Sequence, residues 1–278
     1  MARRNTRSSR KRGRSSRSGS GESSWIWYVV IAACLALVGG VAYVSQSLIS
    51  SSKIDEATLC HTGGALNVTS ILLDLTDPLS ETQQSRLKLF LDAEIANSSV
   101  DTMIALGVVS ENLANWGAKF SKCKPATGEL ANGLYENPVI IAARYDREFT
   151  QPIERTLASM LTGVAEDQSP IMEAMQSLIA ETPDFASAQG FRKIIIVSDM
   201  LQNSETLSFY RGQDWEYFAQ NNGIERLAGS LSGASVEIWR IPRSGGATPS
   251  TDITEGFWTR YFDKQGSRPP SVKSLGDL

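Results

Sequence analysis

Twenty consecutive residues without a charge, Trp25 to Val44, set the N-terminal part of this chain apart. As an α-helix they would be long enough to cross the roughly 30 Å hydrocarbon layer of a membrane. A buried helix of a soluble protein and a cleaved signal peptide are the alternatives, but a signal peptide has a shorter apolar region and a small-x-small cleavage site. Aromatic residues occupy both ends of the run, as they do at membrane interfaces: Trp25, Trp27, Tyr28 and Tyr43. We therefore expect residues 25–45 to form a transmembrane helix that acts as a signal-anchor.

The segment before this run is strongly basic. Residues 1–24 hold eight Lys and Arg side chains and the single acid Glu22, whereas the rest of the chain holds 19 basic and 29 acidic residues, a balance of −10. The arm lacks large apolar residues, so burial of apolar surface cannot offset the conformational entropy that it would lose on folding. We therefore expect it to be disordered. Positive charge beside a span stays in the cytoplasm. The sequence thus predicts a cytoplasmic N-terminus and a periplasmic or extracellular C-terminal domain.

The arm and the span also suggest partners. The arginines can contact anionic lipid heads, while nucleic acid is not an expected partner because no aromatic residues are interleaved with them. Ala32, Ala36 and Gly40 recur every four residues along the span. Small residues at this spacing allow close packing of two helices, which would give a homodimer through the transmembrane helix.

Residues 46–66 are rich in Ser, Thr and Gly and are expected to form a stalk. With 41% hydrophobic and 21% charged residues, the chain is not disordered throughout. From Asn67 onward, apolar runs alternate with helical patterns, which predicts a doubly wound, mostly parallel sheet in a three-layer α/β/α domain over residues 67–265, with a tail at 266–278. The expected strands lie at 67–75, 101–109, 116–123, 191–197 and 234–241.

Cysteine usage fits the same topology. Cys34 lies inside the span, whereas Cys60 and Cys123 lie beyond it, where an oxidising compartment permits a disulfide. A bridge would close a loop of about 60 residues and add roughly 4 kcal/mol, although two cysteines need not meet. His61 is the only histidine in the sequence, so one His and two Cys do not complete a zinc site.

Polar side chains follow two of the expected strands. In doubly wound sheets a ligand site lies beyond the carboxyl ends of the strands. Asp74 and Thr76 follow the first strand, and Ser198 and Asp199 follow the strand at 191–197. Carboxylates and hydroxyls suit a hard divalent cation. The structural alternative is that the aspartates accept hydrogen bonds from backbone amides, while Ser80 and Ser169 cap helices.

The motifs DLTDPLS (Asp74 to Ser80) and IIIVSDM (Ile194 to Met200) resemble the von Willebrand factor A domain. This integrin I-like α/β fold often carries a metal-ion-dependent adhesion site with the motif Asp-x-Ser/Thr-x-Ser, and the resemblance covers about Asn67 to Gln265. Pro78 stands at the third motif position. The resemblance implies a variant site that binds Mg²⁺ or another divalent cation through Asp74, Thr76, Ser80, Ser169 and Asp199.

An aromatic segment, residues 206–220, follows Asp199 and should border the same crevice. Aromatic and Arg side chains are enriched at interface hot spots, although some of these rings, such as Trp215 and Phe218, can instead pack onto the sheet. The residues predicted to bind a partner are Asp77, Phe209, Tyr210, Arg211 and Trp215.

Enzyme mechanisms find little support in the sequence. A Ser-His-Asp arrangement would need His61, which lies before the first strand, and the chain has no glycine-rich phosphate loop. We therefore expect a membrane-anchored protein-interaction module, not an enzyme, that serves adhesion or assembly in an envelope complex. Whether it depends on a divalent metal turns on the two alternatives above, a cation site or a purely structural set of hydrogen bonds. The alternative is a metal-dependent hydrolase that uses Asp74 and Asp199.

Overall fold

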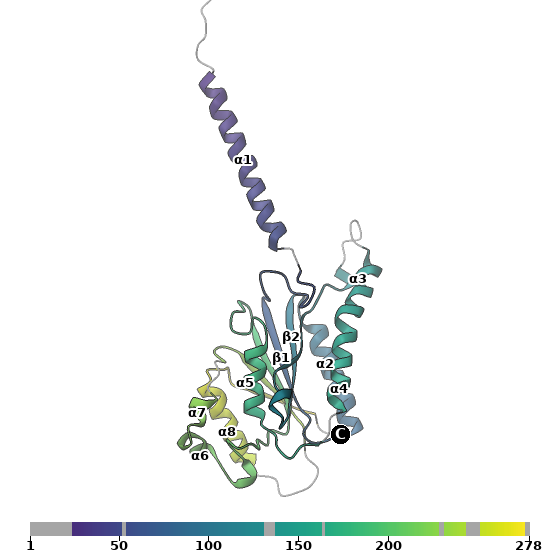
Figure 1. The fold of residues 1–278 in the computed structure, drawn as a ribbon, viewed down its shortest axis with the longest axis vertical. Coiled ribbons are helices and arrows are strands. Elements are labelled where there is room, and N and C mark those ends of the chain that lie inside the picture. The colour runs from purple at the N-terminus through teal and green to yellow at the C-terminus, as the bar shows by residue number, and fades with distance from the viewer. Residues whose placement is uncertain are drawn as a thin grey trace, which may run out of the picture. The chain divides into compact units, whose positions relative to one another are not determined.

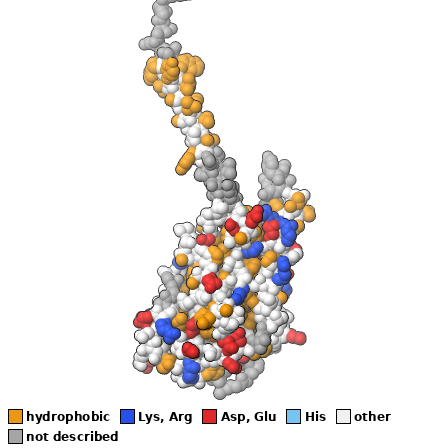
Figure 2. Space-filling view, viewed as in Figure 1, with side chains coloured by type: hydrophobic (Ala, Val, Ile, Leu, Met, Phe, Trp, Pro, Cys, Tyr) orange, Lys and Arg blue, Asp and Glu red, His pale blue; other side chains and the backbone are white. Residues whose placement is uncertain are grey.

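A computed structural model describes residues 24–51, 54–130, 137–162, 165–227, 231–242 and 251–275, and the chain divides into two compact units, residues 1–50 and 51–278. In the first unit, helix α1 (Ser24–Ser51) exposes its apolar side chains (Figure 2). Among the residues described, no helix combines the length and the apolar character needed to cross a membrane. The basic arm expected at 1–24 lies outside the described residues up to position 23.

The second unit is built on a six-stranded sheet in the order β3-β2-β1-β4-β5-β6. All neighbouring pairs are parallel except β2 and β3, which are antiparallel. This confirms the expected α/β class and the mostly parallel sheet. The strands are β1 (Asn67–Asp74), β2 (Thr102–Val109), β3 (Ala118–Cys123), β4 (Arg192–Ser198), β5 (Ser235–Arg240) and β6 (Ser271–Ser274).

Helices cover both faces of this sheet (Figure 1). The hydrophobic core on one face of the sheet contains strand residues such as Leu72 and Ile196 together with Met175 and Phe257 from the helices. The core on the other face contains the strand residues that alternate with these, such as Ile71. Burial on both faces explains why β1, β2 and β4 each contain an unbroken run of at least three apolar residues. Helices α5 (Ile171–Glu181), α6 (Trp215–Gln220), α7 (Gly223–Arg226) and α8 (Thr251–Lys264) belong to the first face, and α2 (Glu81–Asn97) and α4 (Gln151–Leu161) to the second.

A proline changes the helical geometry before α4. Helix α3 (Pro138–Tyr145) continues through a π-helical turn (Asp146–Thr150) into α4. Pro152 has no N–H to give the carbonyl four residues earlier. The Nζ atom of Lys122 donates to that carbonyl, of Glu148, at 3.2 Å. The helix therefore continues past the proline with a side chain in place of the missing amide.

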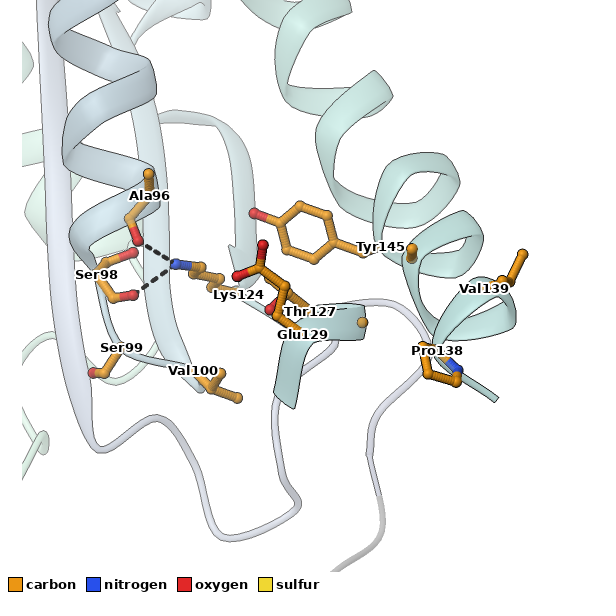
Figure 3. A pocket seen from close by; sticks show the side chains of 12 residues that line it. Ala96, Ser98, Ser99, Val100, Lys124, Thr127, Glu129, Pro138, Val139 and Tyr145 are labelled. Atoms are coloured by element: carbon orange, nitrogen blue, oxygen red, sulfur yellow. Dashed lines mark hydrogen bonds between the residues drawn. The ribbon is translucent and has the colours of Figure 1, made fainter. Parts of the chain in front are cut away.

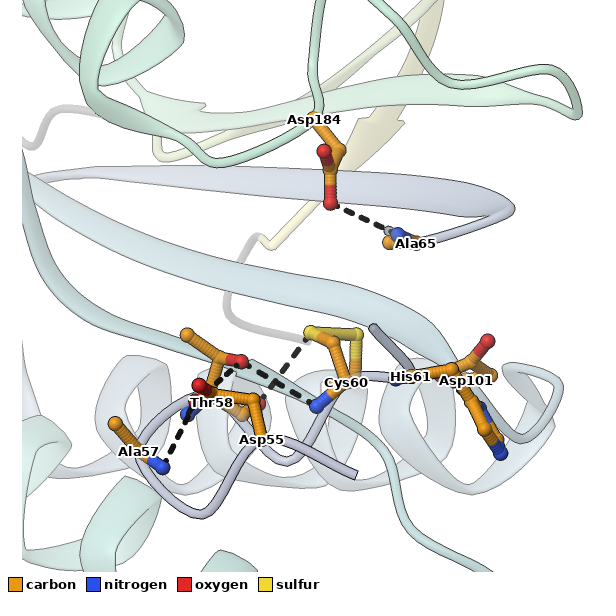
Figure 4. Close-up of a disulfide and its surroundings, with 9 residues drawn as sticks. Asp55, Ala57, Thr58, Cys60, His61, Ala65, Asp101 and Asp184 are labelled. Carbon is orange, nitrogen blue, oxygen red and sulfur yellow. Dashed lines mark hydrogen bonds and ion pairs between the residues drawn. A yellow bond between two sulfur atoms is a disulfide. The ribbon is translucent and has the colours of Figure 1, made fainter. Parts of the chain in front are cut away.

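The two ends of the domain extend further than the sequence indicated. Strand β6 lies in the expected tail and pairs with β5, but its four residues are all exposed, so they carry no apolar pattern. In the expected stalk, α1 continues to Ser51, and residues 54–66 belong to the second unit. Cys60 and Cys123 form a disulfide there, and the Cys123 amide donates to the Thr58 carbonyl at 2.7 Å (Figure 4).

Candidate functional site at the carboxyl ends of β1 and β4

The Asp74 carboxylate, at the last position of β1, is the centre of a buried hydroxyl cluster. Its Oδ1 atom accepts a hydrogen bond from the Thr76 hydroxyl at 2.7 Å. Its Oδ2 atom accepts from the Ser169 hydroxyl at 2.9 Å and the Ser198 hydroxyl at 2.7 Å. A buried carboxylate is costly unless it is hydrogen-bonded, and these three donors stabilise it. The structure thus brings Asp74, Thr76 and Ser169 together.

Strand register and one loop contact build this cluster. Leu73 pairs with Val197 across β1 and β4, so the next residues, Asp74 and Ser198, end up side by side. Ser169 comes from the segment before α5, and its backbone N–H and C=O exchange hydrogen bonds with those of Asn203 at 2.8 and 2.9 Å. The loop after β4 therefore holds the Ser169 hydroxyl in place.

Ser169 does not cap α5. The first turn of that helix is capped from elsewhere, because Gln202 Oε1 accepts from the Met172 amide at 3.0 Å. The Ser169 side chain is thereby available to Asp74. Ser198 was noted after its strand but was not included among the metal ligands predicted. Its position could only be found by knowing that β4 neighbours β1, since no short-range pattern pairs it with Asp74.

Ser80 has a different role from the one the resemblance implied. It is the N-cap of α2, where its hydroxyl accepts from the Gln83 amide at 3.2 Å and its own amide donates to Gln83 Oε1 at 2.9 Å. These reciprocal bonds form a capping box, which satisfies two amides that the helix leaves unpaired. The metal-ligand prediction is therefore corrected at Ser80, because its hydroxyl is committed to the helix.

Asp199 adds a second carboxylate beside the cluster. The pKa of Asp199 is raised to about 7, mainly by burial and to a smaller extent by repulsion from Asp74. The hydrogen bond from the Leu201 amide and the charge of Arg240 act to lower this pKa. The Asp199 Oδ1 atom accepts from that amide at 2.8 Å. Two carboxylates sharing a poorly solvated site resist being charged together. Either a proton or a cation would relieve this repulsion.

The turn after Asp199 has an uncommon backbone. Met200 has a φ of 66°, a left-handed conformation that costs a non-glycine residue on the order of 1 kcal/mol. Its amide donates to the Ser198 hydroxyl at 2.8 Å, and its carbonyl accepts from the Trp258 indole at 2.8 Å. Both bonds are buried, so the surrounding core fixes this turn and with it the direction of the preceding aspartate.

A pocket of about 280 Å³ opens next to the cluster. Tyr210, which lines it, is 46% exposed. Burial of its hydroxyl, followed by the charges of Asp199 and Asp74, raises the pKa of Tyr210, so this group remains a hydrogen-bond donor at neutral pH. The other lining residues are Thr76, Asp77, Glu166, Asp167, Gln168, Ser169, Leu201 and Asn203.

Glu166 holds one side of this pocket together, a role that the sequence did not suggest. Its amide donates to the Thr76 carbonyl at 3.0 Å, and its carboxylate accepts from the Ser110 hydroxyl at 2.8 Å and from the Glu111 amide. It therefore ties the loops after β1 and β2 to the segment that carries Ser169. No motif marks such a residue, because its partners come from two loops that are distant from it in the sequence.

The aromatic residues predicted to bind a partner separate into two groups. Phe209, with 4% exposure, and the half-buried Trp215 pack against Phe257, with ring centroids 5.2 and 5.6 Å apart. These two predictions are corrected, because the rings complete the core under α8. Tyr210 and Arg211 remain exposed, and Arg211 donates to the Ser204 carbonyl at 2.6 Å.

The donor set fits a hard divalent cation in type, since such ions take oxygen ligands. Within the described residues, no group of three or more His, Cys, Asp and Glu side chains could hold a metal, so any cation here must use hydroxyls. The resemblance lacks its third motif residue at Pro78, and Ser80 is committed to α2. The oxygen donors that the structure gathers are Asp74, Thr76, Ser169, Ser198 and Asp199.

The single histidine lies far along the strands from this cluster. His61 Nδ1 is 2.9 Å from Asp101 Oδ1, and Asp101 directly precedes β2. Asp74, in contrast, ends the parallel neighbour β1. The two groups therefore occupy opposite ends of the sheet, so His61 cannot act as a base for a serine at the Asp74 cluster.

Comparisons with known proteins give structural likenesses but no sequence relative. No protein-family model and no curated protein sequence matches this chain. Among solved structures, the chain is similar to the von Willebrand factor type A protein from Catenulispora acidiphila, with a TM-score of 0.37 and 13% sequence identity. The match covers 77% of this chain and 39% of that one.

Proposed function

We propose that this chain is a membrane-anchored, extracytoplasmic protein-interaction module that binds a partner protein of an envelope complex at the Asp74 cluster. The observation that carries the proposal is the placement of this buried carboxylate and three hydroxyls beside an open pocket with the exposed Tyr210. Convergent polar groups at the strand ends of a doubly wound sheet are typical of binding sites.

The proposal includes a divalent cation such as Mg²⁺ at this cluster. Asp74 and Asp199 would balance its charge, and Thr76, Ser169 and Ser198 would add neutral oxygens. When bound, the cation would supply an open coordination position for an acidic group of the partner. Tyr210 and Arg211 provide exposed contacts around that position. Binding without turnover separates this module from the hydrolase alternative.

Membrane anchoring through α1 is part of the proposal. It is supported by the uncharged run from Trp25 to Val44, the basic residues before it and the exposed apolar side chains of the helix. The Cys60–Cys123 disulfide supports an extracytoplasmic location for residues 51–278, because disulfides persist in oxidising compartments. Small residues on α1 would allow it to pair with a second copy.

Site-specific photocrosslinking in native membranes tests the binding site. A photoreactive amino acid at Tyr210 should crosslink a partner protein, whereas the same group at Leu89, exposed on α2, should not. Asp74→Asn should reduce the crosslink, and the matched change Asp92→Asn, at an exposed carboxylate of α2, should leave it intact. Equal crosslinking from Tyr210 and Leu89, or no effect of Asp74→Asn, would contradict the proposal.

The role of the cation needs a separate measurement. Mn²⁺ can replace Mg²⁺ as a spectroscopic probe, and its binding to the purified full-length chain can be followed by electron paramagnetic resonance. Binding that Asp74→Asn abolishes, together with a chelator-sensitive crosslink, would support a metal-mediated contact. A crosslink that persists in chelator would restrict the proposal to direct contacts of the polar pocket. Hydrolysis of a generic phosphoester that is lost in Asp74→Asn would instead support the hydrolase.

A further inference from the structure

A second, larger pocket lies at the other end of the sheet, between α2 and α3 (Figure 3). Its volume is about 1090 Å³, slightly above the range of roughly 300–1,000 Å³ that is typical of small-molecule sites. Apolar groups make up much of the wall, among them Val100, Pro138, Val139, Ala142 and Tyr145. Val139 is 76% exposed, so this apolar surface has no cover within the described chain.

The backbone around this pocket is fixed by close packing. A β-carbon at Gly128 would come within 2.5 Å of the Pro138 carbonyl oxygen, so only glycine allows the short 3₁₀ helix Gly128–Leu130 to meet the start of α3. On the opposite wall, the backbone of Lys124 exchanges hydrogen bonds with Thr102 and Asp101 at 2.9 and 2.8 Å. The cavity is thus formed by ordered elements on both sides.

Lys124 is the unusual group in this wall. Its side chain is buried, with 5% exposure, and its Nζ atom donates to the carbonyls of Ala96 and Ser98 at 2.8 and 2.7 Å (Figure 3). These carbonyls end α2, where a positive charge is favourable. An ammonium has three N–H groups, and the described residues provide neither a third acceptor nor an ion-pair partner for this one. Burial without a counter-charge lowers the pKa of Lys124.

The remaining N–H of Lys124 determines which ligands the pocket can bind. Buried charges in proteins are normally paired, so an anionic group at Lys124 would complete its bonding. One N–H suits one oxygen of a singly charged carboxylate. Tyr145 extends from the facing helix toward Lys124, and burial raises the pKa of Tyr145, so its hydroxyl remains a donor (Figure 3). The exposed Glu129 also lines the pocket, and its carboxylate would repel a doubly charged head group more strongly than a singly charged one.

We propose that this pocket binds a single-chain amphiphile with a carboxylate head, such as a fatty acid, its head group at Lys124 and its chain along Val100, Val139 and Ala142. The site is separate from the Asp74 cluster, and the two proposals can fail independently. A charge-assisted hydrogen bond should favour the acid over an uncharged analogue by at least about tenfold.

Photoaffinity labelling of the purified full-length chain tests this proposal. The probes are a twelve-carbon carboxylic acid with a diazirine in its chain and the matched alcohol, and mass spectrometry locates the labelled residues. The acid should label the α3 wall at least about tenfold more than the alcohol. Equal labelling by the two probes, or no labelling of this wall, would overturn the proposal without any variant.

Three variants identify the groups involved. Lys124→Gln keeps an amide donor for the α2 carbonyls and should bring labelling by the acid down to that by the alcohol. Ala142→Phe should reduce labelling by both probes because it fills the pocket. Lys119→Gln, at an exposed lysine of β3, the strand that Lys124 directly follows, is the matched control and should change nothing. Preferential labelling by the acid that persists in a folded Lys124→Gln chain would also overturn the proposal.

Discussion

Removal of the Cys60–Cys123 disulfide should lower the free energy of unfolding of the second unit by about 4 kcal/mol. The cysteines are 63 residues apart, and closing a loop of this length in the unfolded chain removes about 14 cal/mol/K of entropy. At 25 °C that corresponds to about 4 kcal/mol, and for a urea dependence of about 2 kcal/mol/M the midpoint would fall by about 2 M.

The contacts around the disulfide indicate whether its removal acts on the folded or on the unfolded state. The disulfide joins the entry segment, residues 54–64, to the end of β3, beside the hydrogen bond from the Cys123 amide to the Thr58 carbonyl. The residue that follows this segment, Ala65, is also held, because its amide donates to the Asp184 carboxylate at 2.8 Å (Figure 4). Native contacts on both sides of the bridge therefore remain, and most of the effect should come from the unfolded state.

Urea unfolding of the full-length chain, followed by circular dichroism under oxidising conditions, measures the difference. Cys60→Ala/Cys123→Ala should unfold at lower urea, and Cys34→Ala, at the free cysteine of α1, is the matched control. Reductant should destabilise the wild type and leave the double variant unchanged. A double variant within about 1 kcal/mol of the wild type, or equally sensitive to reductant, would refute the loop-closure argument.

Four further predictions concern the strand-end site and the anchor. Because the pKa of Asp199 is raised to about 7, the folded state binds this proton more tightly than the unfolded chain does. The free energy of unfolding should therefore decrease as the pH rises from about 4 to 7, and Asp199→Asn should remove that part of the decrease in pH-dependent urea titrations. Ser198→Ala should cost about 1–2 kcal/mol in urea unfolding, because it deprives Asp74 of a buried donor. Ser80→Ala should cost about 1 kcal/mol in the same assay while leaving Mn²⁺ binding unchanged, and weaker binding would return Ser80 to the ligand set. If α1 is an anchor, the chain should stay in the membrane pellet after alkaline carbonate extraction, whereas release into the supernatant would contradict anchoring.

The sheet could be predicted from the sequence where burial leaves a signal. Strands β1, β2 and β4 are apolar on both faces, so their positions were found within one or two residues. Strand β6 was missed because its four residues are exposed and give no apolar pattern; they pair with β5 through the backbone and through the ion pair of Lys273 with Glu237.

The site was harder to predict than the fold because its members meet through strand order and loop contacts. Asp74, Thr76 and Asp199 were identifiable from their positions after two strands. Ser198 required the knowledge that β1 and β4 are neighbours. The role of Ser169 depended on Gln202, which caps α5 in place of Ser169 by accepting from the Met172 amide. Gln202 and Met172 are thirty residues apart in the sequence. A serine before a helix looks the same in a sequence whether it caps that helix or binds a carboxylate elsewhere.

The proposed function requires the Asp74 cluster to be stable both without and with a cation. Without a cation, hydroxyl donors from Thr76, Ser169 and Ser198 compensate the Asp74 charge, while a raised pKa keeps Asp199 protonated below about pH 7. The same hydroxyl oxygens carry lone pairs, so they can serve a cation as ligands. A cation must then displace the proton of Asp199 and the hydrogen bonds to Asp74. Its affinity should accordingly rise with pH, and a partner that supplies a further carboxylate should bind more tightly once Asp199 is ionised and the cation is held.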